Sequence, residues 1–225
     1  MGKIFDMDSP FMRVMSRIGD LLFLNIIMII CCIPVITAGA ACTAMHYVLL
    51  KIVRKEEGYL IRGFFKSFKQ NFKQATLIWL MMLLMIGIFI GDYFIFSYSG
   101  IDFSKGFTII FFAVAIVLLM GSVYIFPILA RFDNTIKNTI KNAFFMAILN
   151  LPKTILMVLL LFVPFIIIYF STYATFFVIM FGISGPAYIA AYLYSDIFKK
   201  FEPEQGTPVS DLEFSVKVDE EKERE

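Results

Sequence analysis

The sequence predicts an all-α fold: a polytopic transmembrane helix bundle of about five spans, with a kinked or broken first helix. The 225 residues are 60% apolar, include 27 Phe and have a mean hydropathy of +0.82. A soluble domain of this length has to leave charged side chains over most of its exterior. The charged residues are also bunched. The stretches between them reach the roughly 20 apolar residues that a helix needs to cross a bilayer.

The first apolar segment, residues 21–50, is longer than one crossing requires. Pro34 removes a backbone donor and Gly39 has no side chain to favour a helix. We therefore expect a kink or a break between Pro34 and Ala40. The leader before it, residues 1–20, is a short amphipathic segment suited to the membrane interface. Its length, its acidic residues and the apolar character beyond Ala40 argue against a cleaved signal peptide.

Four further segments meet the same length criterion. They cover residues 75–96, 107–130, 154–170 and 174–194. Pro164 lies inside the fourth predicted span. The fifth contains Gly182, Gly185 and Pro186, and the Gly185-Pro186 pair predicts a second break.

The chain divides into two regions by composition. Residues 1–200 form the predicted transmembrane domain, and residues 201–225 form an acidic tail with almost no apolar residues. Such a tail cannot bury enough apolar surface to order itself, which predicts a disordered cytoplasmic end.

The distribution of basic residues predicts the orientation, because cytoplasmic loops are enriched in Lys and Arg. The loops after the first and third segments are basic, and Lys199 and Lys200 follow the fifth. Five spans then place the C-terminus in the cytoplasm and the N-terminus outside. The basic residues of the leader oppose this arrangement. The alternative is a first segment that re-enters at Pro34, which leaves four spans and a cytoplasmic leader.

The two predicted breaks resemble each other. Residues 37–41 and 183–187 both place small residues inside an apolar helix that ends in basic residues. Paired broken helices are a sequence pointer to a central binding site in transporters; ordinary small-residue packing is the alternative. The single histidine also lies at membrane depth, where an ionisable group is a functional candidate. The candidate break and binding residues are Pro34, Thr37, Gly39, His46, Ser184, Gly185 and Pro186. We expect the hydroxyls of Thr37 and Ser184 to lie near the carbonyl groups that the breaks expose.

Residues 60–73 have one basic and one apolar face at helical spacing. The basic face consists of Arg62, Lys66, Lys69 and Lys73. The apolar face consists of Leu60, Ile61, Phe64, Phe65, Phe68 and Phe72. This pattern predicts a helix on the anionic surface of the lipid bilayer. The alternative is a docking helix for a cytoplasmic partner.

Several shorter features predict packing or interface roles. Gly87 and Gly91 form a Gly-x-x-x-Gly pair that favours a close helix contact within the chain or in a homodimer. Trp79 suits an interfacial anchor. Arg131 and Asp133 are interpreted as interface residues that follow the third span.

Catalytic and cofactor-binding signals are missing from the sequence. With one His there is no Ser-His-Asp set, and no Gly-rich phosphate loop is present. The three Cys all lie in the first apolar segment without metal-ligand spacing. The middle of each predicted span holds no Asp, Glu, Lys or Arg, which ion-coupled transporters usually need. We therefore expect no enzymatic activity, no cofactor or metal and, at a net charge of +2, no nucleic acid partner.

The chain resembles the YesL-like family of multi-pass membrane proteins, a domain of unknown function found mainly in Gram-positive bacteria. The resemblance rests on residues 33–41, 43–44, 64–68, 124–127, 130–133 and 141–143. It extends to about Lys200, and Ala40 departs from the family's usual Gly-Pro pair. It implies a plasma-membrane protein, often encoded beside carbohydrate ABC transporters, with those transporter subunits as partners. The function hypothesis is an accessory or regulatory role in carbohydrate import; the alternative is a small facilitator or carrier with its site at the two breaks.

Overall fold

The computed structural model describes residues 10–56, 58–98 and 105–202, and these residues are helical with short connections. In chain order the elements are α1 (Pro10–Cys32), η1 (Val35–Thr37), α2 (Ala38–Arg54), α3 (Leu60–Tyr98), α4 (Lys105–Arg131), α5 (Ile136–Leu149), α6 (Leu151–Phe170), η2 (Thr172–Ala174), α7 (Thr175–Phe181) and α8 (Ser184–Lys199). Within the described part, α1, α2, α3, α4 and α6 are long and apolar enough to cross a membrane. The predicted all-α bundle is confirmed, and its helices suit a multi-pass membrane protein.

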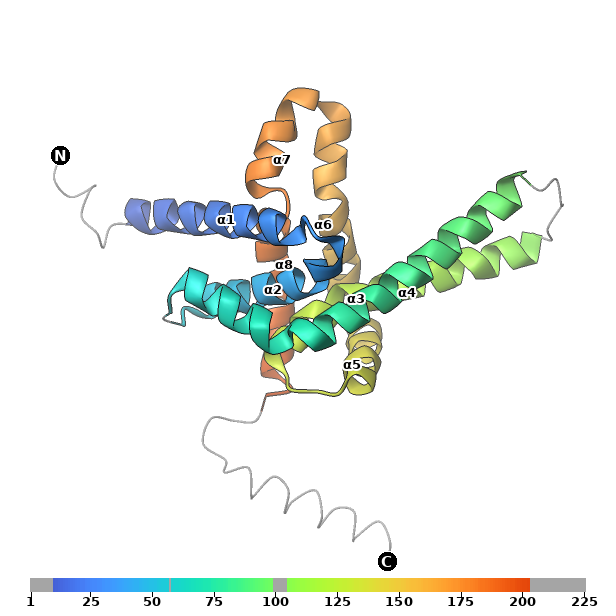
Figure 1. Ribbon diagram of the computed structural model, residues 1–225, viewed down its shortest axis with the longest axis horizontal. Helices are drawn as coiled ribbons and strands as arrows, with labels where there is room; N and C mark the ends of the chain where they lie inside the picture. Colours follow the sequence, from blue (N-terminus) through green and yellow to red (C-terminus); the bar gives the residue numbers. More distant parts are fainter. Residues whose placement is uncertain (1–9, 57, 99–104, 203–225) are drawn as a thin grey trace, which may run out of the picture.

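The first apolar segment forms two helices. α1 begins inside the predicted leader, with Pro10 at its first position, where a missing N–H is tolerated. It ends at Cys32, and the chain passes through Pro34 in an extended conformation before η1 and α2. Figure 1 shows α2 returning alongside α1 in the opposite direction. The predicted break is therefore correct, but residues 21–50 are not one bent span; they belong to two antiparallel helices that are each long enough to span.

The last apolar segment is also broken, but the break lies before the Gly185-Pro186 pair at which the sequence predicted it. α7 and α8 meet at Gly182 and Ile183 and differ in direction by 46°. Pro186 lies in the first turn of α8, where proline does not disrupt the helix. The pair together has the length of a sixth span.

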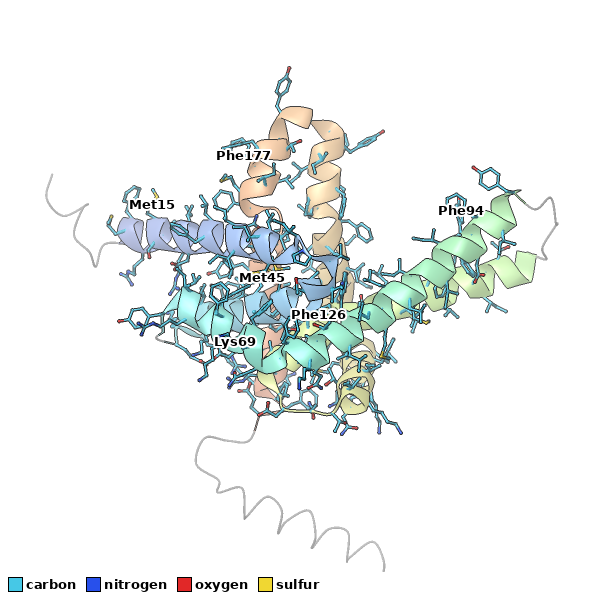
Figure 2. All side chains as sticks on the ribbon, in the orientation of Figure 1. Met15, Met45, Lys69, Phe94, Phe126 and Phe177 are labelled. Carbon is cyan, nitrogen blue, oxygen red and sulfur yellow. The ribbon has the colours of Figure 1, made fainter. Side chains whose placement is uncertain are left out.

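The predicted surface helix and the second predicted span form one continuous helix, α3, of 39 residues. Figure 1 shows α3 bending part-way along, just beyond Lys69, which is labelled in Figure 2. Beyond the bend, α3 pairs with α4 in a hairpin that extends away from the other helices.

The core lies where α2 crosses α3, α4 and α8. Met45 of α2 and Phe126 of α4 are buried there, whereas Met15 and Phe94 lie on the extended arms (Figure 2). Gly39 brings α2 against α3, because an added Cβ would lie 2.5 Å from the Trp79 Cβ and 2.6 Å from the Ala75 carbonyl oxygen. Small residues allow such close contact between membrane helices.

Candidate functional site

The break between α7 and α8 is held by a side chain from α1. Asn25 is completely buried. Its Nδ2 donates to the Ile179 carbonyl oxygen at 2.7 Å, and its Oδ1 accepts from the amides of Ile183 at 3.0 Å and Ser184 at 2.8 Å. Backbone groups freed at membrane depth must find protein partners, because lipid offers none. Asn25 thus supplies three hydrogen bonds at the break.

The break between α1 and α2 is held by Thr37 and Trp79. The Thr37 hydroxyl contacts the carbonyl oxygens of Cys31 at 2.5 Å and Pro34 at 2.8 Å. The Trp79 indole donates from Nε1 to the Val35 carbonyl oxygen at 2.7 Å. The sequence predicted that hydroxyls would lie near exposed carbonyls, and Thr37 does so. Trp79, interpreted as an interfacial anchor, bonds the break itself.

Ser184 behaves differently from Thr37. It is buried, but its Oγ has no hydrogen-bond partner in the described part of the chain. The expectation that its hydroxyl would lie at an exposed carbonyl is wrong. At this break the side chain of Asn25 bonds the backbone amide of Ser184. A Cβ added at Gly185 would lie 3.9 Å from the Phe181 Cβ, an ordinary van der Waals distance.

His46 packs between α2 and α8. Its Nδ1 lies 3.1 Å from the hydroxyl of Tyr194, and the two rings meet edge to face with centroids 5.7 Å apart. Tyr194 is fully buried. The histidine thus has a polar partner that is 148 residues away in the sequence. We therefore interpret His46 as a core residue whose ring nitrogen has a hydrogen-bond partner. No carboxylate contacts it in the described part of the chain.

An ionic cluster ties the ends of three helices together. Glu202 accepts from Arg54 Nη1 at 2.7 Å and from Arg131 Nε at 2.8 Å. Arg54 Nε also donates to the Ser195 hydroxyl at 3.3 Å. Arg131 is therefore not the simple interface residue that the sequence suggested. Glu202 is the second residue of the predicted tail. Residues 203–225 lie outside the described part of the chain.

Burial and pairing act in opposite directions on Glu202. Burial raises the pKa of this carboxyl, but hydrogen bonds from Arg54 and Arg131 outweigh it, and the pKa falls to about 2. The carboxylate is consequently charged throughout the physiological range. It connects α2 and α4 to the end of α8.

The amphipathic segment of α3 is helical as predicted, but its apolar face has two parts. Phe64 and Ser67 are buried and Phe68 is partly buried, on the side of α3 that packs against α2. Ile61, Phe65 and Phe72 remain exposed. All four residues of the basic face, Arg62, Lys66, Lys69 and Lys73, are exposed.

Gly87 and Gly91 do not make the contact within the chain that the sequence favoured. Both are exposed, and an added Cβ at either would meet nothing within 4 Å. The helix pair of α3 and α4 uses another face of α3, which carries Met82 and Phe89.

The predicted break residues do not gather into one site. Thr37 lies with η1 against Trp79 of α3, whereas Ser184 lies against Asn25 of α1. Asn25, Glu202 and Tyr194 were missed as site residues. The available signal was a polar residue inside an apolar segment, which marks Asn25 as a residue that needs a buried partner.

Residues 21–93 match the model of a family described as a protein of unknown function, DUF624. The match covers the second half of α1, all of α2 and most of α3, which is less than half of the chain. The resemblance to YesL-like proteins in this region is consistent with it. Comparison with curated proteins and with solved structures gave no match. The chain is thus similar, over residues 21–93, to a family whose description names no activity.

Proposed function

We propose that this chain is a non-enzymatic accessory or regulatory membrane protein that acts beside a carbohydrate ABC transporter. The resemblance to YesL-like proteins supports the transporter as a partner. The observation that carries the accessory role is the exposed basic face of α3. Lys69 of this face is labelled in Figure 2 and lies at the side of the bundle where α8 ends, next to the cluster of Arg54, Arg131 and Glu202. A cytoplasmic partner would find several cationic side chains there without any change of fold.

The facilitator alternative has less support. It requires a polar hollow at the two helix breaks, and the backbone groups there are bonded by Asn25, Thr37 and Trp79. Closed breaks favour the packing interpretation of the small residues over a solute site. We therefore assign the breaks a structural role.

We also propose that both termini are cytoplasmic. Residues from the ends of α2, α4 and α8 meet in the Glu202 cluster, so these three ends share one side of the membrane. The enrichment of Lys and Arg at these ends makes that side the cytoplasm. α1 runs opposite to α2 (Figure 1), which brings the start of α1 at Pro10 to the same side. The outward N-terminus expected from five spans is not needed once the first segment forms a hairpin.

Single cysteines in a background without Cys31, Cys32 and Cys42 test this topology. Tyr173→Cys, at a position that is 95% exposed between α6 and α7, should react with an impermeant thiol reagent in intact cells. Gln70→Cys and Ser16→Cys, both at exposed positions, should react only after the cells are permeabilised. Labelling of Ser16→Cys in intact cells would restore the outward N-terminus, and labelling of Gln70→Cys would reverse the whole orientation.

The partner proposal predicts the effect of removing the basic face. The combined change Arg62→Gln, Lys66→Gln, Lys69→Gln and Lys73→Gln should reduce copurification of ATPase or permease subunits by at least about tenfold. Loss of roughly 1 kcal/mol per cation at a charged surface is enough for this effect. The measurement is affinity purification of the tagged full chain in mild detergent.

The control keeps the charge and changes the side chains. Arg62→Lys with Lys66→Arg, Lys69→Arg and Lys73→Arg should retain the partners. If the Gln variant retains them too, the basic face serves only as a membrane-surface element and the docking proposal fails.

A further inference from the structure

An apolar pocket of about 600 Å³ lies between α3 and α4 and is bordered by α5. Its walls are mostly Ile, Leu, Met and Phe side chains. On α3 the lining extends from Ile78 to Tyr93, and α5 contributes Ile140 and Phe144. The Ser122 hydroxyl in the wall donates to the Leu119 carbonyl oxygen at 2.7 Å, so it is already bonded within α4.

This lining is suited to hydrocarbon. A buried water needs two to four polar partners, and these walls offer almost none. Tyr93 lies 15 residues after Ile78, which corresponds to about 22 Å of helix. One leaflet of the hydrocarbon core is about 15 Å thick. The pocket is therefore long enough to hold an extended acyl chain.

A smaller pocket of about 340 Å³ lies at the preceding turn of α3 and at the start of α5. It is lined by Lys73, Gln74, Leu77, Thr135 and Ile136. Leu77 directly precedes Ile78 on α3, and Ile136 lies one turn before Ile140 on α5. The two pockets thus follow one another along the same two helices.

The smaller pocket has the chemistry of a headgroup site. Lys73 is exposed at its wall, and Lys137 and Lys141 are exposed on the flank of α5. In the described part of the chain, no acidic side chain lines it. Lys73 therefore gives this pocket a positive charge. That charge suits the phosphate of a lipid whose headgroup has no ammonium group.

We propose that the two pockets together bind one anionic phospholipid. The acyl chain lies between α3 and α4, and the phosphate lies beside Lys73 at the cytoplasmic end. Gly87 and Gly91 take no part, because they are not among the residues that line either pocket. The site shares Lys73 with the basic face of α3 that is proposed to contact the transporter partner. Lipid binding by the purified chain alone does not need that partner, so the two proposals are tested separately.

Native mass spectrometry of the full chain in mild detergent tests the acyl part. Ala115→Phe places a ring in the pocket and should reduce binding of both phosphatidylglycerol and phosphatidylcholine at least tenfold. Ala113→Phe makes the same change on the exposed side of α4 and should leave binding unchanged. Equal lipid binding by the two variants would overturn the site.

The headgroup part is tested by lipid selectivity. The unmodified chain should prefer phosphatidylglycerol over phosphatidylcholine about fivefold, the factor for about 1 kcal/mol from one Lys. Lys73→Gln should abolish this preference, whereas Lys69→Gln, another exposed Lys of α3 outside the pocket, should keep it. Equal affinity of the unmodified chain for the two lipids would contradict the assignment. Displacement of the lipid by inorganic phosphate alone would contradict it as well.

A photoreactive phosphatidylglycerol with its diazirine on the acyl chain gives a readout without any mutation. The labelled peptides should come from the stretches around Met82 on α3 and Leu119 on α4. Labels confined to other helices would overturn the proposal. A lipid-free dimer that Ala115→Phe dissociates would also overturn it, because a second copy would then fill the pocket.

Discussion

Asn25→Leu should destabilise the folded protein by about 2–5 kcal/mol and loosen the junction of α1 with α7 and α8. Asn25 makes three hydrogen bonds to the break. A hydrogen bond between membrane helices contributes about 0.6–1.7 kcal/mol, and the freed backbone groups remain buried without water. Unfolding in mixed micelles, followed by the fluorescence of the single Trp79, measures the loss.

Two further variants identify the cause of that loss. Asn138→Leu replaces an exposed Asn of α5 and should change the free energy of unfolding by less than about 0.5 kcal/mol. In Asn25→Leu, the amides of Ile183 and Ser184 should exchange hydrogen faster, because they lose their acceptor. Normal stability together with protected amides would show that the break is held by packing alone.

The two helix breaks could be predicted from the sequence because their causes are local. Pro34 cannot donate a backbone hydrogen bond, and Gly182 lies where a Cβ would collide with the carbonyl of Val178. The group that satisfies the second break could not be predicted. Asn25 and Ile179 are 154 residues apart, and only the folded arrangement of α1 against α7 brings them together.

The number of crossings was harder to predict than the fold class. The length criterion treats residues 21–50 as one unit because the charges of the leader interrupt its apolar character. In the structure, α1 begins at Pro10, so it carries Arg13 and Arg17 in its first half. The amphipathic pattern of the leader indicated a helix there. It did not indicate that this helix continues into the apolar segment as one element.

Two motifs show why a sequence pattern can predict a helix face without predicting what packs against it. Gly87 and Gly91 permit a close helix contact, yet both face open space. The apolar face of the basic helix was expected to meet lipid, and Phe64 is instead completely buried in the protein. In each case the spacing predicts a helix face correctly, whereas the occupant of that face depends on tertiary packing.

The Glu202 cluster is the other feature that depends on long-range packing. Arg54 is only 9% exposed and Glu202 20% exposed, so solvent screens their ion pair weakly. Removing one partner of such a pair leaves a buried charge without compensation and typically costs about 3–5 kcal/mol. The Nη2 of Arg54 already lacks a partner in the described part of the chain. Arg54 is therefore sensitive to loss of the carboxylate.

Glu202→Gln should lower the free energy of unfolding at neutral pH by about 2–4 kcal/mol. It should also remove part of the acid sensitivity of the unmodified protein. The folded pKa of Glu202, about 2, lies below its ordinary value of 4.5. A depressed pKa contributes stability that is complete above the unfolded value and is lost as the pH falls toward the folded one. The unmodified protein should thus lose about 2–3 kcal/mol between about pH 4.5 and 2, and the variant should not.

Asp196→Asn provides the matched control for this prediction. Asp196 is 67% exposed and lies 3.9 Å from Lys153, so the pair is a solvent-screened surface contact. Its loss should change the free energy of unfolding by less than about 1 kcal/mol. Unfolding in micelles at a series of pH values compares the three proteins. If Glu202→Gln follows the same pH curve as the unmodified chain, Glu202 does not hold α2 and α4 to the end of α8, and the helices are joined there by apolar packing such as that of Phe132 on Phe198.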